Sequence, residues 1–175
     1  MKDVELKLIC ELMKNSRKSD RELAKAIGTS QPTVSRLRNK LEKEGYIKEY
    51  TAIPDFHKLG FEIVAITFSS FLRELASEEL NELRRASKEL EKKNPRAILM
   101  AMNGMGLGFN RVFISFHENY SSYMKTLRLI KTIPNVDSSH VESFVISLVG
   151  EEHFQPLTLL TIAKYLIEKE RRNRL

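Results

Sequence analysis

The sequence predicts an α+β protein with a helical first part and a sheet-containing second part. Helical apolar periodicity fills most of the first 50 residues, runs rich in β-branched and aromatic residues begin at Phe61, and strands and helices alternate from there on. The 175 residues, 42% of them hydrophobic, can build two small cores. We expect a first domain over residues 1–53, a linker over 54–60, a second domain over 61–150, and a C-terminal helix with a basic tail over 151–175.

The charge is positive and unevenly distributed. The chain carries a net charge of +6 and has a pI near 9.4. Residues 1–50 hold 12 Lys and Arg against 8 Asp and Glu, whereas the remaining residues hold 17 against 15. The excess therefore lies on the smaller helical part, as expected for a module that contacts a polyanion such as DNA.

Several classes of protein are excluded by what the sequence lacks. A single cysteine, Cys10, excludes an intramolecular disulfide and a Cys-rich zinc site. His57, His117, His140 and His153 are too scattered to predict a metal site, and we expect no cofactor. No apolar run approaches the ~18 residues of a membrane span, and the N-terminus has no signal sequence, so we expect a cytoplasmic protein without a membrane partner.

The first part predicts three helices, and the second and third form a tight pair. The first covers Asp3 to Lys14. Ser19 and Glu22 form a capping box that begins the second helix, and Gly28 is placed to end it because glycine tolerates a positive φ. Ser30 or Gln31 then caps the third helix, with a proline in its first turn.

The spacing of this pair is that of a helix-turn-helix. A small residue, Ala24, is followed four positions later by Gly28 and six positions after that by Val34, which with Leu37 and Leu41 forms a buried face. The opposite face carries donors and cations suited to base edges and phosphates: Gln31, Thr33, Ser35, Arg36, Arg38, Asn39 and Lys40. The alternative is an ordinary helical hairpin with a solvated polar face. We expect Ser35 and Arg36 to contact bases, and Arg38 and Lys40 to contact phosphates.

A short wing is predicted after the third helix. Gly45 ends that helix, and residues 46–50 alternate like a strand. Lys48 and Tyr50 would then lie beside the DNA backbone, although a plain connecting strand is an equal alternative for them. Pro54 and the short segment after it form the linker.

The second part has the order strand, helix, strand, strand, helix, strand, which is the ferredoxin-like pattern. We expect strands over 61–71, 97–103, 111–117 and 136–148, helices over 77–93 and 120–133, and a glycine-rich loop over 104–110. Both helices of this fold cover one face of the sheet. The first strand is apolar on both faces, so the uncovered face must be buried, and a second copy of the chain is the simplest partner. We therefore expect a homodimer or a larger even assembly.

One more helix is expected over residues 155–173, with an apolar side that includes Leu160, Ala163 and Ile167. The chain then ends in the basic sequence ERRNRL. Three roles remain open for this end: a dimer clasp, a DNA contact or a solvated tail.

These residues resemble the Lrp/AsnC family of transcriptional regulators, also called feast/famine regulatory proteins. The resemblance covers roughly residues 3–149 and is carried by DVELKLICELMKN, SDRELAKAIGTSQPTVSRLRNKLEKEGYIKEY, KLGFEIVAITF and IPNVDSSHVES. It implies a winged helix-turn-helix joined to a dimerising ferredoxin-like domain, binding to double-stranded DNA, and amino-acid effectors held between dimers. The family's DNA contacts correspond to Gln31, Thr33, Ser35, Arg36 and Arg38.

The effector region departs from the family pattern. Family members commonly place a glycine and a nearby acidic residue in the loop between the second and third strands. Here that loop, with Gly104, Gly106 and Gly108, contains no carboxylate to pair with an amino acid's ammonium group. We assign these glycines to an effector site. Either this site binds a small molecule other than an amino acid, or it binds no ligand.

Two alternatives to a regulator remain open from the sequence. Siroheme decarboxylases share this two-domain layout and use His and Arg side chains in the second domain, a role open here to Arg111, His117 or His140. A ligand-sensing partner subunit that does not bind DNA is the other. The cationic face of the third helix favours a sequence-specific DNA-binding transcriptional regulator, without catalytic residues.

Overall fold

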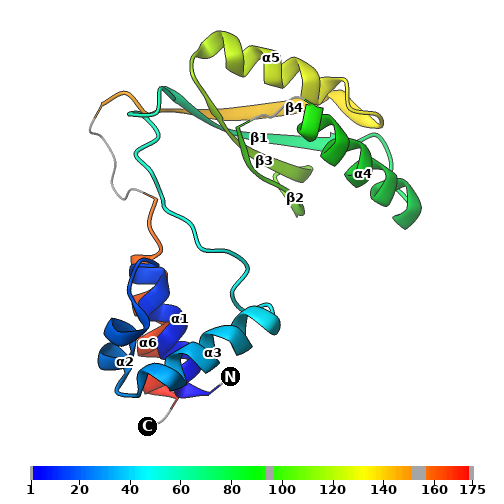
Figure 1. The fold of residues 1–175 in the computed structure, drawn as a ribbon. Helices are drawn as coiled ribbons and strands as arrows, with labels where there is room; N and C mark the ends of the chain where they lie inside the picture. The colour runs from blue at the N-terminus through cyan, green and yellow to red at the C-terminus, as the bar shows by residue number, and fades with distance from the viewer. Residues whose placement is uncertain (1, 94–96, 151–156, 174–175) are drawn as a thin grey trace. The chain divides into compact units, whose positions relative to one another are not determined.

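The computed structural model describes residues 2–93, 97–150 and 157–173, which form two compact units (Figure 1). Unit 1 comprises Met1–Pro54 together with His153–Leu175, and unit 2 comprises Asp55–Glu152. The end of the chain thus returns to the unit with which the chain begins. No described helix is long and apolar enough to cross a membrane.

The described residues of unit 1 form four helices: α1 (Asp3–Lys14), α2 (Asp20–Ile27), α3 (Gln31–Lys43) and α6 (Leu160–Arg172). Two apolar clusters hold them together. The larger joins α1, α2 and α3 around the buried side chains of Leu8, Leu12, Leu23, Ala24, Val34, Leu37 and Leu41. The smaller joins α1 to α6.

The predicted strand over residues 46–50 is absent. No strand is assigned there, and the segment instead turns back onto α3, where the amides of Tyr46 and Ile47 donate to the carbonyl of Leu41. Ile47 packs against the larger cluster of unit 1. Alternating side chains do not make a strand without a neighbouring strand to supply hydrogen bonds, and no strand is described in unit 1.

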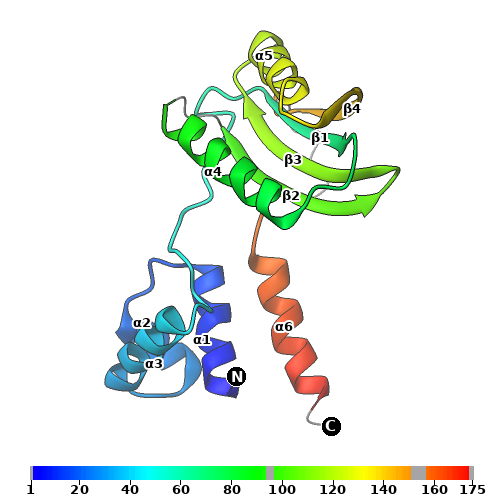
Figure 2. The ribbon, with the colours of Figure 1, turned by 90° about the vertical axis from the view of Figure 1, so that its right-hand side faces the viewer.

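Unit 2 has the predicted βαββαβ order. Its elements are β1 (Ile63–Phe71), α4 (Ser77–Lys93), β2 (Ile98–Gly106), β3 (Phe109–His117), α5 (Tyr120–Lys131) and β4 (Val136–Ser147). The four strands form one antiparallel sheet in the order β2-β3-β1-β4, which is the ferredoxin-like topology. In Figure 2, α4 crosses in front of β2 and β3, while α5 lies above β4.

The glycine-rich loop is shorter than predicted. β2 continues through Gly104 to Gly106, and the chain reverses at Leu107 and Gly108, which both have positive φ. Gly106 pairs with Phe109 across the turn. β2 and β3 continue to pair through their backbones beyond the residues that alternate between apolar and polar. The sequence pattern therefore could not predict this extension of the strands.

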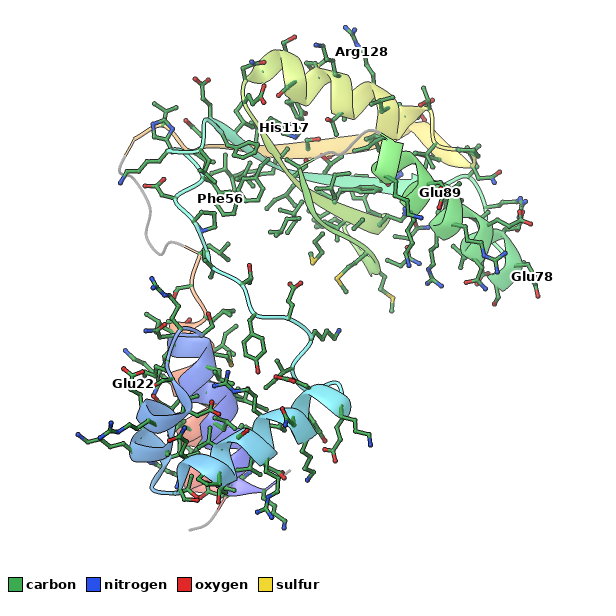
Figure 3. All side chains as sticks on the ribbon, in the orientation of Figure 1. Glu22, Phe56, Glu78, Glu89, His117 and Arg128 are labelled. Atoms are coloured by element: carbon green, nitrogen blue, oxygen red, sulfur yellow. The ribbon has the colours of Figure 1, made fainter. Side chains whose placement is uncertain are left out.

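The two faces of the sheet differ in polarity. The rings of His117 and of Tyr123 on α5 meet edge to face, so residues in register with His117 face α5 (Figure 3). This face buries the polar side chains of Thr67, Ser69 and Ser115 beside the apolar side chains of Ala65 and Phe113. The opposite face carries Val64, Ile66 and Phe68 on β1 with Val112, Ile114 and Phe116 on β3. Rings of Phe56 and Phe61 cover Phe116 on that side, and Phe144 is 65% exposed.

Candidate nucleic-acid interface

The turn between α2 and α3 is fixed by local hydrogen bonds. The Glu22 carboxylate accepts from the Ser19 amide at 2.8 Å, and Ser19 Oγ accepts from the Glu22 amide, so the predicted capping box is present. Gly28 ends α2 with φ of 71°, a left-handed conformation that glycine adopts without strain. Ser30 caps α3 through the amide of Thr33, with Pro32 in the first turn. These bonds satisfy amides that would otherwise be unpaired at helix ends.

The third helix presents one apolar and one polar side. Val34 and Leu41 are fully buried and Leu37 is nearly so, which seats α3 against α1 and α2. On the other side, exposed side chains follow one another along the helix surface: Gln31, Ser35, Arg36 and Asn39, with Thr33 half-buried beside them. The structure therefore brings together five of the predicted contact residues on one accessible ridge.

The remaining two predicted contact residues of α3, Arg38 and Lys40, are held by acidic partners. Arg38 is half-buried, and its Nη2 lies 2.6 Å from Oδ1 of Asp20 on α2. Lys40 Nζ donates to Oε1 of Glu5 on α1 at 2.6 Å and lies 3.7 Å from Glu44. Each ion pair links α3 to another helix of unit 1. Arg38 and Lys40 thus fix the position of α3 as well as carrying charge.

Glu5 is an unusual residue for this environment. Its side chain is only 4% exposed, yet it carries a charge. The hydrogen bond from Lys40 and then the bond from the Lys2 amide lower its pKa below the usual 4.5. Sequence reasoning missed Glu5, although a helical wheel places it three positions before Leu8, on the buried side of α1. A charged residue on the buried side of a helix was the feature of the sequence that could have identified Glu5.

Lys48 and Tyr50 lie beyond α3 without a wing strand to carry them. Both are exposed. The hydroxyl of Tyr50 donates to Glu42 at 2.6 Å, and the Arg38 guanidinium lies 5.6 Å from the centre of its ring. Partial burial of the phenol, reinforced by the bond to Glu42, raises the pKa of Tyr50 to about 12. Tyr50 therefore supports the end of α3 as a neutral phenol.

A pocket of about 210 Å³ lies at the β2–β3 end of unit 2. Two of the predicted effector glycines, Gly104 and Gly106, line it, with Phe68, Leu107 and Arg111 among its other walls. Gly108 lies in the adjacent turn, where the Ser70 hydroxyl donates to its carbonyl. No lining residue is acidic, so this pocket suits an anionic or neutral molecule.

Arg111 is held between aromatic rings. Its guanidinium carbon lies 4.6 Å from the ring centre of Phe71 and 4.9 Å from that of Phe113. Burial lowers its pKa. Among the described residues, Arg111 Nη1 and Ser69 Oγ are buried polar atoms without a hydrogen-bond partner, and these two residues face each other across β3 and β1.

The side chains considered for a decarboxylase do not converge. Arg111 and His117 lie at opposite ends of β3, about 20 Å apart along the strand. His117 is bonded to Ser115 at 2.8 Å, and burial lowers its pKa. His140 stacks on Phe109 instead. Among described residues, no three His, Cys, Asp or Glu side chains are placed to hold a metal ion; His153 lies outside those residues.

Residues 1–48 match a family model described as winged helix-turn-helix DNA-binding. PH0061 of Pyrococcus horikoshii, an HTH-type transcriptional regulator, is 34% identical over 80 residues, or 46% of this chain and 54% of the relative. LrpC of Bacillus subtilis, another such regulator, is 43% identical over 63 residues, or 36% and 44%. The leucine-responsive regulatory protein of Rhizobium meliloti is 36% identical over 62 residues, or 35% and 40%. The matched segment thus spans about half of these relatives or less.

Two of these relatives have solved structures that resemble both units together. The structure of PH0061 covers 90% of this chain and 98% of its own, with a TM-score of 0.67 and 23% identity. The structure of LrpC covers 89% and 99%, with a TM-score of 0.65 and 25% identity. These relatives are regulators, and none of them supports the decarboxylase alternative. The sequence of the first unit and the fold of both units are thus similar to those of HTH-type transcriptional regulators that include LrpC and a leucine-responsive regulatory protein.

Proposed function

We propose that this protein is a sequence-specific DNA-binding transcriptional regulator that acts as a homodimer or a larger even assembly. The main support for the proposal is the ridge of α3. Its polar and cationic side chains are exposed, while the apolar side of the same helix is buried in unit 1. A helix of this kind fits the major groove, which admits an α-helix and displays a distinct pattern for each base pair.

Individual roles follow from exposure and chemistry. Ser35 and Arg36 reach base edges, with Gln31, Thr33 and Asn39 beside them. Arg38 and Lys40 contact phosphates while keeping their acidic partners; Nε and Nη2 of Arg38 are buried and Nη2 pairs with Asp20, so the donors on Nη1 would make the phosphate contact. Lys48 adds a further phosphate contact.

The test begins with selection of bound fragments from genomic DNA, followed by titration of the selected duplex. Arg36→Ala should weaken the specific site by about 1–3 kcal/mol and relax the preference at one base position. Arg128→Ala, which removes the same charge from the exposed side of α5, is the matched control and should bind normally. Absence of any selected sequence, or normal binding by Arg36→Ala, would contradict the proposal.

The dimer proposal rests on the apolar face of the sheet in unit 2. Val64, Ile66 and Phe144 stand on the face opposite α5, where Phe144 is largely exposed. A contiguous apolar surface of this kind is usual at subunit interfaces. A two-fold dimer would present two copies of α3 to a pseudo-palindromic site, with half-sites about 10–10.5 base pairs apart or a multiple of that.

We also propose a small-molecule effector for the pocket lined by Gly104 and Gly106, next to Gly108. The apolar walls and the single cation, Arg111, favour a small carboxylate with an apolar body over a zwitterionic amino acid. Matched pairs test this: each branched 2-oxo acid against its amino acid, measured by the shift in thermal unfolding. Equal shifts for both members, or a shift that survives Arg111→Met, would contradict the assignment.

A further inference from the structure

Helix α6 is attached to the side of α1 that the other helices leave uncovered. Leu6 and Cys10 of α1 and Ala163 of α6 form a buried cluster, with Cys10 and Ala163 fully buried. Met13, Leu166 and Ile167 pack around it. Figures 1 and 2 both show α6 antiparallel to α1, which begins where α6 ends. Since α1 lies between α6 and the α2–α3 pair, it is the middle layer of unit 1.

The opposite side of α1 holds the recognition helix. Leu8 and Leu12 contribute to the cluster that seats α3, and Glu5 holds Lys40 of α3 at 2.6 Å. Because Glu5 immediately precedes Leu6 in the same helix, a rotation or shift of α1 that followed loss of α6 would move the Glu5 carboxylate relative to Lys40. A continuous contact path therefore runs from α6 through α1 to the centre of the DNA-facing helix.

We infer that α6 is a positioning element of the DNA-binding unit, and that Ala163 and Glu5 are the residues through which it holds α3 in register for base contacts. This inference rests on the proposed DNA-binding function. Unit 2 is inserted in the chain between α3 and α6, so unit 1 is complete only after the whole of unit 2 has been made and the chain has returned.

Ala163→Glu in the full-length chain tests the inference, because a carboxylate cannot stay buried against Leu6 and Cys10 without a partner. Thr161→Glu is the matched control: it adds the same charge to an exposed position of the same helix. Release of α6 is measured by the rate at which a thiol reagent modifies Cys10, which is fully buried in the native protein and whose pKa burial raises. Ala163→Glu should react about tenfold faster or more, since buried thiols are inert.

DNA affinity is then measured on the selected site and on an unrelated duplex. Mispositioning of α3 should lower specific affinity by about tenfold, the discrimination that one good base contact supplies, while non-specific affinity stays within about twofold because phosphate attraction needs no exact register. Unfolding of unit 1 would lower both affinities together. Equal loss on both duplexes, or no loss despite an exposed Cys10, would overturn the inference.

A double-mutant cycle with Glu5→Gln tests the route. If α6 acts through the Glu5–Lys40 pair, the loss of specific affinity in the double variant should be smaller than the product of the single losses, because coupled residues are not additive. If the losses of the two single variants multiply in the double variant, α6 does not act through the Glu5–Lys40 pair. Should the wild type bind no duplex, the proposed function fails on its own, and the Cys10 rates of Ala163→Glu and Thr161→Glu still decide whether α6 is held by this cluster.

Discussion

At the scale of single residues, acidic side chains set the position of two cations of α3. Asp20 holds Arg38 and Glu5 holds Lys40, and both acids lie on helices that face α3. The identity of the cations was predictable from the sequence, since they fall on the polar side of a helical wheel. Their partners were not, because Glu5 and Lys40 are 35 positions apart and no local pattern links them.

The Glu5–Lys40 pair makes unit 1 sensitive to acid. The folded-state pKa of Glu5 is lower than its usual 4.5, so the stabilisation is complete above that value and is lost as the pH falls through the lower folded pKa. Glu5→Gln should therefore flatten the decline in melting temperature below pH 4.5. Glu49→Gln, which changes an exposed glutamate after α3, is the control for general charge effects. Identical acid profiles for Glu5→Gln and the wild type would remove this role.

Replacing Lys40 should affect both DNA binding and folding. Lys40→Gln removes one proposed phosphate contact, which should reduce the slope of log affinity against log salt by about one unit on every duplex. It also leaves the Glu5 carboxylate without its main partner, so the melting temperature should fall, and adding Glu5→Gln should restore part of that fall. A lower melting temperature with an unchanged salt slope would make Lys40 purely a structural residue.

At the scale of elements, the sequence predicts features set by local signals better than features set by long-range packing. The Ser19–Glu22 box, the glycine at position 28 and the stripe through Val34 lie within a few residues of one another, so the sequence alone predicts α2, the turn and α3. The prediction of a strand at residues 46–50 was wrong because a strand needs a neighbouring strand to pair with. Side-chain periodicity does not show whether such a neighbour is present. The packing of α6 on α1 brings together segments more than 140 positions apart, beyond the reach of any local pattern.

The turn between α2 and α3 depends on the backbone of Gly28. A Cβ atom added there would meet nothing within 4 Å, so the cost of Gly28→Ala arises from its φ of 71° and not from a clash. We expect a loss of about 1–2 kcal/mol in the free energy of unfolding of unit 1. Gly104→Ala is a matched control in open space without a positive φ, and denaturant melts should show it close to neutral for unit 2. Equal destabilisation by the two changes would refute the backbone explanation.

At the scale of the whole molecule, the sheet of unit 2 predicts association. Phe144→Lys places a charge on the apolar face and should shift the protein toward monomer in sedimentation experiments, because an unpaired charge is costly in an interface. Specific DNA affinity should fall as well, since both half-sites must be bound together. Arg128→Glu on the α5 side is the control and should leave the assembly unchanged. A Phe144→Lys protein of unaltered mass would exclude this face as the interface.

The uneven polarity of the two sheet faces affects the stability of a newly made chain. Thr67, Ser69 and Ser115 beneath α5 contribute little hydrophobic stabilisation, whereas on the other face Val64 and Ile66 are only half-buried and Phe144 is largely exposed. If a second copy of the chain covers this face, as proposed, its binding would add free energy of stabilisation that the single chain lacks. Expression level should accordingly determine how long a chain survives proteolysis, so that scarce copies are degraded and abundant ones persist.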